Sequence, residues 1–517
     1  MSETSETTNT GAELSPVSPR ARWIALSALV LAVLLIAVDG TVLHLALPMI
    51  TEELKPTSQE LLWIGDIYSF VLAGLLVTMG TLGDRIGRKK LLLIGAVCFG
   101  LISVLAAFAT SSALLIAARA LLGLAGATIM PSTLSIIRNL FTDPNERVMA
   151  IGIWGAMTAA GAAVGPVVGG VLLQNFHWGS VFLINVPVMV ILLIVGWKVL
   201  PESKDPNPGA WDLPSAVASL VGMIALVYGI KEIAAVGFGL PAAIGIGVGV
   251  LVLGWFARRQ LKLPVPLVDV RLFRTGKFSG AVFADLLAVL ALSGVVFFGA
   301  QFLQLVQGYQ PFDAGIRELP VTVGSVISGL LAGAFAARHS ARVVCASGLG
   351  LTALSLGAIV FIQGDSPYLP FGIILLLVGF GCGASFTISA SVVLSAVPKE
   401  KAGAAAAVAE TAYELGTALG IALIGSIMTA VYRANVIPPP GLSAADLAVA
   451  KDSLGGATDV AKDLGALGQQ LVDVAKHAFV DGMHWASVAS AVVIGVAAVS
   501  AWFMLKGASA DASPGHH

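Results

Sequence analysis

The chain has 517 residues, of which 57% are hydrophobic and only 11% are charged, and its mean hydropathy is +0.91. Soluble proteins carry about 25% charged residues, so this composition excludes a soluble enzyme and a disordered protein and predicts that most of the outer surface faces lipid. The 29 Lys and Arg residues nearly balance the 30 Asp and Glu residues, which excludes the basic field that nucleic-acid binding requires.

Apolar segments long enough to cross a bilayer recur along the whole chain. A membrane-spanning helix needs about 20 apolar residues, and fourteen segments reach this length. The seventh is the weakest, because Gly222 interrupts it and Lys231 and Glu232 follow it. We therefore predict an all-α integral membrane protein. The predicted spans are residues 23–47, 61–82, 90–110, 113–137, 148–172, 180–199, 212–234, 239–257, 278–300, 314–337, 343–362, 369–395, 403–432 and 484–505.

The positions of Lys and Arg predict the orientation of these spans. Basic residues gather in the cytoplasmic loops of membrane proteins, and most of the 29 Lys and Arg residues lie in the N-terminal segment and in alternate loops after it. Both termini are therefore expected in the cytoplasm. Residues 1–22 lack the features of a secretory signal and form a predicted N-terminal tail, and residues 506–517 form the C-terminal tail.

The segment 433–483, between the last two spans, is long and polar, and the predicted orientation places it outside the cell. Its stretches 443–454 and 458–481 have helix-like spacing and are separated by Gly455 and Gly456. We predict a small helical hairpin outside the membrane. A mobile linker is the alternative.

The turn between the second and third spans combines glycines with charges, and it reads GTLGDRIGRKK. Glycines allow two helix ends to approach closely, Asp84 can pair with an arginine or cap a helix, and the basic cluster holds the turn at the inner membrane surface. A plain basic loop would not explain Gly83, Asp84 and Gly87 together. We therefore predict a conformational switch made of Gly80, Gly83, Asp84, Arg85, Gly87 and Arg88.

Two ionisable residues lie at similar depth in the first and fourth spans. Ionisable side chains inside spans are costly and indicate functional sites. Asp39 and Arg119 lie about 12 Å and about 9 Å inward from the predicted outer ends of their helices, so they can pair. Breaking the pair favours neutral Asp39 and remaking it favours the carboxylate, which would make Asp39 a proton carrier. A permanent ion pair that fixes two helices is the alternative.

Glu410 and Glu414 stand four residues apart in the thirteenth span and share one helix face, which Tyr413 flanks. Two like charges in an apolar site cannot both ionise at low cost, so one carboxyl group should hold a proton. An arriving cation would stabilise the ionised form and expel the proton, as an exchanger requires. Alternatively, one Glu is buried and the other lies near the inner surface.

The second span places an acid among aromatic residues. Asp66 stands close in sequence to Trp63 and Tyr68, and aromatic faces beside a carboxylate suit an organic cation. An interfacial position of Trp63 is the alternative. Asp285, in the ninth span, belongs to no recognised motif. The predicted substrate-binding residues are Asp66, Trp63, Tyr68, Glu410, Tyr413 and Asp285.

Small residues form a stripe along the fifth span. Glycines four residues apart allow backbone contact with a neighbouring helix, and Pro166 favours a bend because it lacks a backbone donor. Ordinary helix packing is an alternative that explains the glycines alone. The stripe consists of Gly161, Gly165, Pro166, Gly169 and Gly170.

These segments resemble the motifs of the major facilitator superfamily. The turn at Asp84 resembles its GxLaDrxGrkxxl signature, and the stripe resembles the gxxxGPxxGG motif of its antiporters. The segment from Asp39 to Pro48 resembles lDxTvvNvALP, with His44 in place of Asn. Arg119 and Gly123 resemble lxxRxxqGxgaa, with Leu122 in place of Gln. The WRWiFliNvP motif is matched, with Gly179 in place of Arg, by Trp178, Phe182, Leu183, Asn185, Val186 and Pro187.

The resemblance implies the major facilitator fold, with six-helix bundles at residues 23–200 and 278–505 and two linking spans at 212–257. The fourteen-span form is similar to QacA-like drug:proton antiporters. It implies rocker-switch export of lipophilic organic cations, such as quaternary ammonium compounds, dyes and biguanides, by a monomer in the cytoplasmic membrane. Proton entry is the implied driving force, with no cofactor or metal. The expected proton-coupling residues are Asp39, Arg119, Glu410 and Glu414.

Other functions remain as alternatives. A lipid, siderophore or metabolite exporter would share the fold, and so would a sugar/proton symporter, although the acids in the spans suit cations better. An ATP-driven pump needs a phosphate-binding G-x-x-x-x-G-K-[ST] loop, which the sequence lacks. An intramembrane enzyme is disfavoured because the histidines are scattered. The three cysteines, Cys98, Cys345 and Cys382, lie in apolar stretches and are interpreted as packing residues.

Overall fold

Long α-helices form nearly all of the described chain in this computed structural model. The structure describes residues 18–56, 58–204, 212–264, 266–398, 402–437, 439–440, 442–462 and 464–508. Within these ranges no β-strand occurs. The all-α prediction is confirmed.

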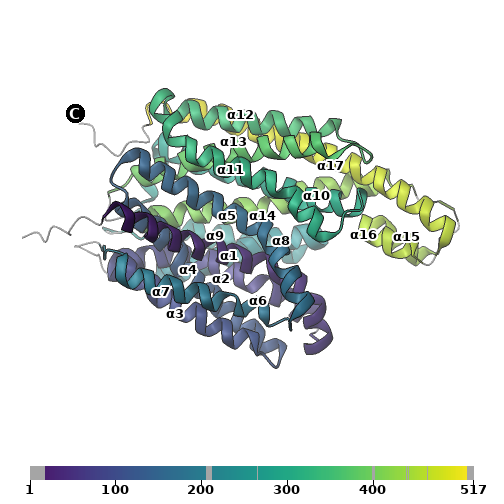
Figure 1. Cartoon of the computed structure of the whole chain (residues 1–517), viewed down its shortest axis with the longest axis horizontal. Coiled ribbons are helices and arrows are strands. Elements are labelled where there is room, and N and C mark those ends of the chain that lie inside the picture. The colour runs from purple at the N-terminus through teal and green to yellow at the C-terminus, as the bar shows by residue number, and fades with distance from the viewer. Residues whose placement is uncertain are drawn as a thin grey trace, which may run out of the picture.

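The first helices form one half of the molecule. They are α1 (Pro19–Leu54), α2 (Ser58–Ile86), α3 (Arg88–Ala107), α4 (Ser112–Leu140), α5 (Pro144–Asn175), the short α6 (Ser180–Leu183) and α7 (Asn185–Val199). α1 packs against α5 and α7, and α4 packs against α2 and α3. In Figure 1 these helices occupy the lower and middle part of the view, in purple to blue.

The last helices form the other half, which reaches the top and the right side of the view in Figure 1. They are η1 (Val270–Arg274), α10 (Gly276–Gln301), the π-helix η2 (Phe302–Val306), α11 (Pro311–His339), α12 (Ala341–Ala358), η3 (Ile359–Phe361), α13 (Tyr368–Ser395), α14 (Ala402–Asn435), α15 (Ala444–Asp452), α16 (Leu454–Ala461) and α17 (Gly465–Met504). The halves meet along two seams, because α5 packs against α11 and α2 packs against α14.

Two linking helices, α8 (Leu213–Val236) and α9 (Leu240–Gln260), pack on each other, and α8 also contacts both α2 and α14. The pair therefore lies over one of the two seams. Asp212 and Arg259 join the helices at one end through hydrogen bonds of 2.8 and 3.0 Å. These bonds and one from the Ser215 hydroxyl hold the pKa of Asp212 below its ordinary value, with the Arg259 bond the main cause.

Twelve segments of the described chain are long and apolar enough to cross a membrane. They confirm a multi-pass membrane protein. α5 and α14, of 32 and 34 residues, also lie within the bundle and exceed the length that a span needs. The count of fourteen crossings and the cytoplasmic position of both termini stay predictions. Following that orientation, we use "inner end" for the end that carries the α2–α3 turn and "outer end" for the opposite one.

The first helix extends further than its apolar run. α1 continues to Leu54, whereas the predicted span stops at residue 47. The Glu53 carboxylate at its outer end accepts hydrogen bonds of 2.8 Å from His177 and from Trp178, and these bonds, first that of His177, lower the pKa of Glu53. Because of the extension, Asp39 lies near the middle of α1.

The outer end of the second half projects beyond the other helices (Figure 1). α17 has 40 residues, and α15 and α16 pack beside its first part. The break between these two helices falls at Ser453, whose hydroxyl accepts a hydrogen bond from Gly456 N and caps α16. Gly455 and Gly456 are thus inside a helix instead of separating two.

Candidate functional site

The first half holds a buried ion pair near its centre. Asp39 on α1 and Arg119 on α4 are each 1% exposed, and Arg119 Nη1 lies 2.9 Å from Asp39 Oδ2. Charged groups are buried in proteins when they are paired and hydrogen-bonded. The structure therefore brings together the two residues whose pairing the sequence predicts.

The other partners of this pair come from three more helices. Asn185 Nδ2 on α7 donates to Asp39 Oδ1 at 2.9 Å and to Ser103 Oγ on α3 at 3.1 Å. Arg119 Nε donates to the Ile64 carbonyl at 3.3 Å, and its guanidinium carbon lies 4.6 Å from the centre of the Tyr68 ring on α2. Five helices thus contribute to one cluster around Asp39 and Arg119.

The glycine stripe of α5 presses against α1 on both sides of Asp39. A Cβ atom at Gly161 would lie 2.3 Å from Ala37 Cβ, and one at Gly165 would lie 1.9 Å from Thr41 Oγ1. No side chain fits at either position, so the stripe sets the α1–α5 distance. Gly169 is buried, Gly170 has open space around its Cβ position, and the side chain of Pro166 lies outside the described part.

The second half buries two carboxyl groups differently. Asp285 on α10 and Glu410 on α14 are 4% and 2% exposed. Asp285 Oδ1 and Glu410 Oε2 have no hydrogen-bond partner among the described residues. The two residues interact electrostatically with each other, and both interact with Tyr413. Their burial favours a bound proton or a bound cation over a free charge.

α10 and α14 lie in backbone contact and run in the same direction. A Cβ atom at Gly416 would lie 2.6 Å from the Leu286 carbonyl oxygen, and a second glycine makes the same contact one turn further on. This register places Asp285 level with Glu414. Glu414 is half-buried and interacts electrostatically with Tyr68 across the seam between the halves.

The aromatic residues of the second span lie in different surroundings. Tyr68 is buried against Arg119, whereas Trp63 is 37% exposed and contacts Phe70 edge-on with ring centres 6.1 Å apart. The position of Trp63 favours the interfacial alternative. The side chain of Asp66 lies outside the described part, so its predicted role stays a prediction.

A row of aromatic rings crosses between the halves. Trp154 on α5 stacks on Phe386 of α13 with ring centres 6.2 Å apart, and Phe386 contacts Tyr413 of α14 edge-on at 6.0 Å. The Trp154 indole N–H donates to the Thr133 hydroxyl at 3.0 Å. Tyr413 therefore connects the predicted acidic site with an aromatic surface that suits a flat cation.

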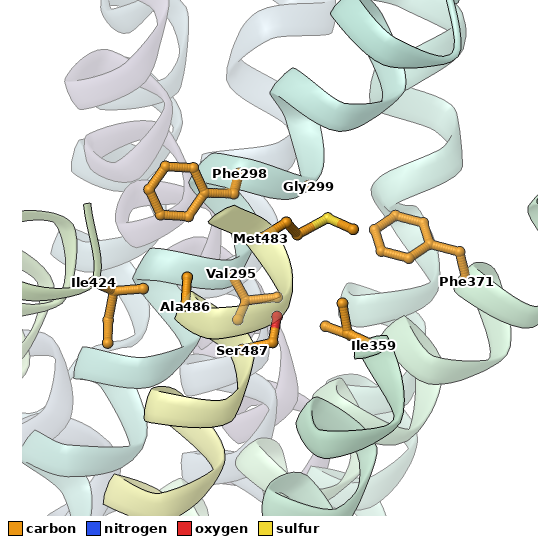
Figure 2. A pocket seen from close by; sticks show the side chains of 9 residues that line it. All are labelled: Val295, Phe298, Gly299, Ile359, Phe371, Ile424, Met483, Ala486 and Ser487. Atoms are coloured by element: carbon orange, nitrogen blue, oxygen red, sulfur yellow. The ribbon is translucent and has the colours of Figure 1, made fainter. Parts of the chain in front are cut away.

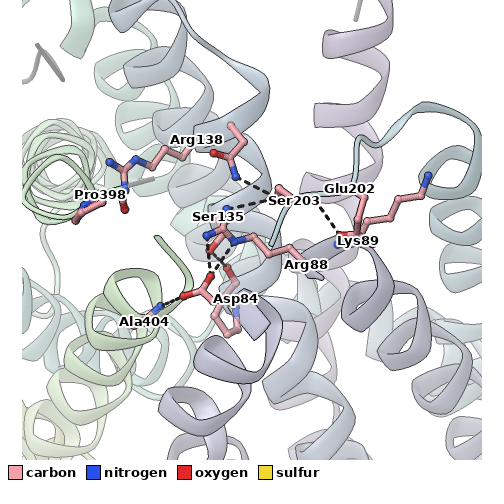
Figure 3. Close-up of polar contacts among 11 residues, drawn as sticks. Asp84, Arg88, Lys89, Ser135, Arg138, Glu202, Ser203, Pro398 and Ala404 are labelled. Carbon is pink, nitrogen blue, oxygen red and sulfur yellow. Dashed lines mark hydrogen bonds and ion pairs between the residues drawn. The ribbon is translucent and has the colours of Figure 1, made fainter. Parts of the chain in front are cut away.

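The predicted switch joins the halves at the inner end, as Figure 3 shows. Asp84 at the end of α2 pairs with Arg88 at 2.7 Å, and its second oxygen accepts a hydrogen bond of 3.1 Å from Ala404 N. Ala404 lies in the first turn of α14, where backbone N–H groups lack partners inside the helix. One carboxylate thus binds its own half and caps a helix of the other.

A second contact between the halves lies near that of Asp84 and uses a basic side chain instead of an acidic one (Figure 3). Arg138 at the end of α4 donates to the carbonyl groups of Val397 at 2.6 Å and Pro398 at 3.3 Å. These carbonyls follow the C-terminal end of α13, which favours a cation. An acid of the first half at the start of one helix and a base near the end of another thus join the two halves at the inner end.

The remaining switch residues support the turn. Gly80 and Gly83 are buried in α2, and Arg85 is half-buried. Gly87 has a φ of 111°, and a Cβ atom there would lie 2.7 Å from the Glu202 carboxyl group. Glu202 also accepts hydrogen bonds of 3.1 Å from the backbone N–H groups of two successive residues of α3, which caps that helix.

Sequence reasoning assigned no role to four residues that the structure places at these sites: Arg138, Asn185, Glu202 and Glu318. Glu318 on α11 lies one turn inside a predicted span, and an ionisable residue at such a position indicates a functional site. Its Oε1 is buried without a partner in the described part of the chain and faces Gly299. Gly299 lines a cavity of about 10 Å³, the room of about one water molecule, together with Phe298, Phe371 and Met483 (Figure 2).

Comparisons with known proteins agree with this architecture. A sequence model of the Major Facilitator Superfamily matches residues 29–421. The multidrug efflux pump LfrA of Mycolicibacterium smegmatis is 45% identical over 482 residues, which cover 93% of this chain and 96% of that relative. The methyl viologen resistance protein SmvA of Salmonella typhimurium is 38% identical over 486 residues, covering 94% and 98%. The human organic anion transporter MFSD10 (TETRAN) shares the fold, with a TM-score of 0.62 at 13% identity over 93% of this chain and 99% of that chain.

Proposed function

Because the chain belongs to the major facilitator superfamily, it is a membrane transporter and not an enzyme, and we propose that it exports lipophilic organic cations in exchange for protons. Quaternary ammonium compounds, dyes and biguanides are the proposed substrates. The proton gradient across the cytoplasmic membrane supplies the driving force, without a cofactor. The proposed active form is a monomer.

Two relatives support drug export. LfrA is named a multidrug efflux pump, and SmvA is named for resistance to methyl viologen, which is an organic dication. Both align with more than nine-tenths of this chain. The alignment thus includes α8, α9 and the projecting outer helices along with the two halves.

The proposal depends on a difference between the buried acids of the two halves in their hydrogen-bond and ion-pair partners. Asp39 has an arginine partner, whereas Asp285 and Glu410 each keep a carboxyl oxygen without a hydrogen-bond partner among the described residues. A carboxyl group without a cationic partner in an apolar site binds a proton, and an incoming organic cation can replace that proton. Glu410 and Glu414 are the proposed exchange site, and Asp285 and Tyr413 are proposed to contact the substrate.

The two halves are proposed to rock about this central site. Residues 23–200 and 278–505 form the two proposed units, 212–257 links them, and both tails lie in the cytoplasm. In the proposed cycle, the contacts of Asp84 and Arg138 between the halves belong to the state whose central site opens to the outside. Proton binding from that side and drug release to it would then occur together.

Transport in liposomes tests this function. Purified protein is reconstituted, ethidium is supplied, a pH difference is imposed, and a pH-sensitive dye reports proton movement. We expect proton flux opposite to ethidium flux and no dependence on ATP. If ethidium neither moves nor causes proton flux, ethidium export is wrong, and a lipid, siderophore or metabolite exporter becomes the better assignment. A sugar/proton symporter would instead move a sugar in the same direction as protons.

Replacing Asp84 by Asn is expected to slow conformational exchange by about 10-fold, since a charge-assisted hydrogen bond between the halves is lost. Ethidium affinity should change much less, because Asp84 lies at the inner end and not at the buried acids. Turnover in liposomes and equilibrium ethidium binding measure the two effects separately. Unchanged turnover would contradict the switch assignment, and Asp143→Asn at the exposed N-cap of α5 serves as a control.

A further inference from the structure

Within the described ranges, Asn185 is the amide side chain that hydrogen-bonds to the Asp39 carboxylate, and the proposed transport cycle gives it no task. It is fully buried, with an exposure of 0%. Its Nδ2 donates to both Asp39 Oδ1 and Ser103 Oγ, whereas its Oδ1 has no partner among the described residues. The amide therefore uses only its donor side in this arrangement.

The chemistry of an amide allows a second arrangement. A carboxylate can only accept hydrogen bonds, while a protonated carboxyl group must donate one. If the Asn185 amide turns over, its Oδ1 takes the place of Nδ2 and accepts from the Asp39 O–H and from the Ser103 hydroxyl. In the described part of the chain no group is hydrogen-bonded to Asn185 Oδ1, so the turn breaks no hydrogen bond on that side of the amide.

We propose that Asn185 is a positioning residue that reads the protonation state of Asp39, donating to the carboxylate and accepting from the carboxyl group. No covalent bond in Asn185 changes, and the proton on Asp39 comes from the medium. The inference rests on the proposed proton exchange. It explains how the Asp39–Arg119 ion pair can break inside the protein while Asp39 keeps a hydrogen-bond partner, both as a carboxylate and as a protonated carboxyl group.

The groups around Asp39 leave this task to Asn185. α4 supplies Arg119, a permanent cation that only donates. α2 supplies Tyr68, which packs its ring on Arg119 and interacts electrostatically with Asp39 and with Glu414 of α14. Its hydroxyl makes no hydrogen bond in the described part of the chain. α5 supplies backbone at Gly161 and Gly165 and no ionisable group within contact of these positions. Among the described residues that hydrogen-bond to Asp39, Asn185 is thus the one whose side chain carries both a donor and an acceptor.

The pH profile of ethidium-driven proton flux tests the assignment. In Asn185→Leu the donor to the carboxylate is lost. Hydrogen bonds to ionised groups are stronger than those to neutral groups, so the neutral form gains and the midpoint should move about one pH unit towards alkaline pH. Asn185→Asp, of the same shape, should move it further, because two carboxyl groups must share a proton. Asn185→Gln should restore much of the profile, and Asn175→Leu, an exposed matched control, should leave it unchanged.

An infrared titration separates this inference from the transport assignment. The band of protonated Asp39 is identified by its loss in Asp39→Asn, and it should appear at higher pH and at a different frequency in Asn185→Leu. If wild-type protein shows no ethidium-driven proton flux, the transport function is wrong and this band alone decides about Asn185. A folded Asn185→Leu or Asn185→Asp protein with the wild-type profile and band would overturn the proposal. Asn185 would then have a structural role only, linking α7 to α1 and α3.

Discussion

Asp39→Asn is expected to abolish ethidium-driven proton flux, with a loss of at least about 100-fold, the contribution of a well-placed proton-transfer group. The amide oxygen can still accept from Arg119, but it cannot take up and release a proton at physiological pH. The variant also leaves Arg119 as a buried cation without its counter-charge, which favours one conformation of the first half. Flux assayed in liposomes, beside ethidium binding to purified protein, measures the loss.

The control for this variant is Asp365→Asn, which makes the same change at an exposed position in the outer connection before α13. It should transport at the wild-type rate. Size-exclusion chromatography and thermal unfolding establish that Asp39→Asn is folded and inserted. A folded Asp39→Asn protein that transports normally would show that the ion pair is permanent and structural, as the alternative interpretation of the sequence holds.

Glu414→Gln is expected to separate ethidium binding from proton release, so that ethidium still binds while ethidium-driven proton flux falls by at least about 100-fold. Glu414 lies level with Asp285 and interacts with Tyr68 across the seam, so it can be reached from both halves. Glu410 lies one turn closer to the inner end and is more deeply buried. Proton release on ethidium addition, measured in weakly buffered detergent solution, reports this step directly.

Glu232→Gln on the linking helix α8 is the matched control and should release protons as the wild type does. Glu410→Gln gives a second comparison. If the two acids share one proton, either variant removes it, and the double variant should be no worse than the single ones. Normal proton release on ethidium addition in Glu414→Gln would contradict the role assigned to that residue. The exchange site would then be assigned to Glu410 and Asp285.

Local patterns in the sequence predicted the residues whose partners are set by short motifs. Asp39 and Arg119 could be paired because depth within a helix follows from the residue count. The turn at Asp84 could be singled out because a plain basic loop does not explain its glycines and its acid. The contact of Asp84 with Ala404 could not be predicted, because the partner is a backbone group 320 residues away.

Other features depend on tertiary packing that apolar periodicity does not encode. The predicted last span begins at residue 484, whereas α17 begins at Gly465, because polar residues end a span without ending a helix. Glu202 belongs to a connection whose sequence gives no sign that it caps α3. Asn185 belongs to a recognised motif, but its role becomes visible only when α7 is placed beside Asp39.

The 40 residues of α17 have a mechanical consequence. A continuous helix of this length measures about 60 Å, twice the thickness of the hydrocarbon core, so its outer part extends rigidly from the second half. In the proposed rocking motion, rotation of that half turns α17 with it, and the tip of α17 beside α15 and α16 moves farther than any residue within the membrane. A small rearrangement around the buried acids would thus produce a larger displacement at the predicted extracellular tip.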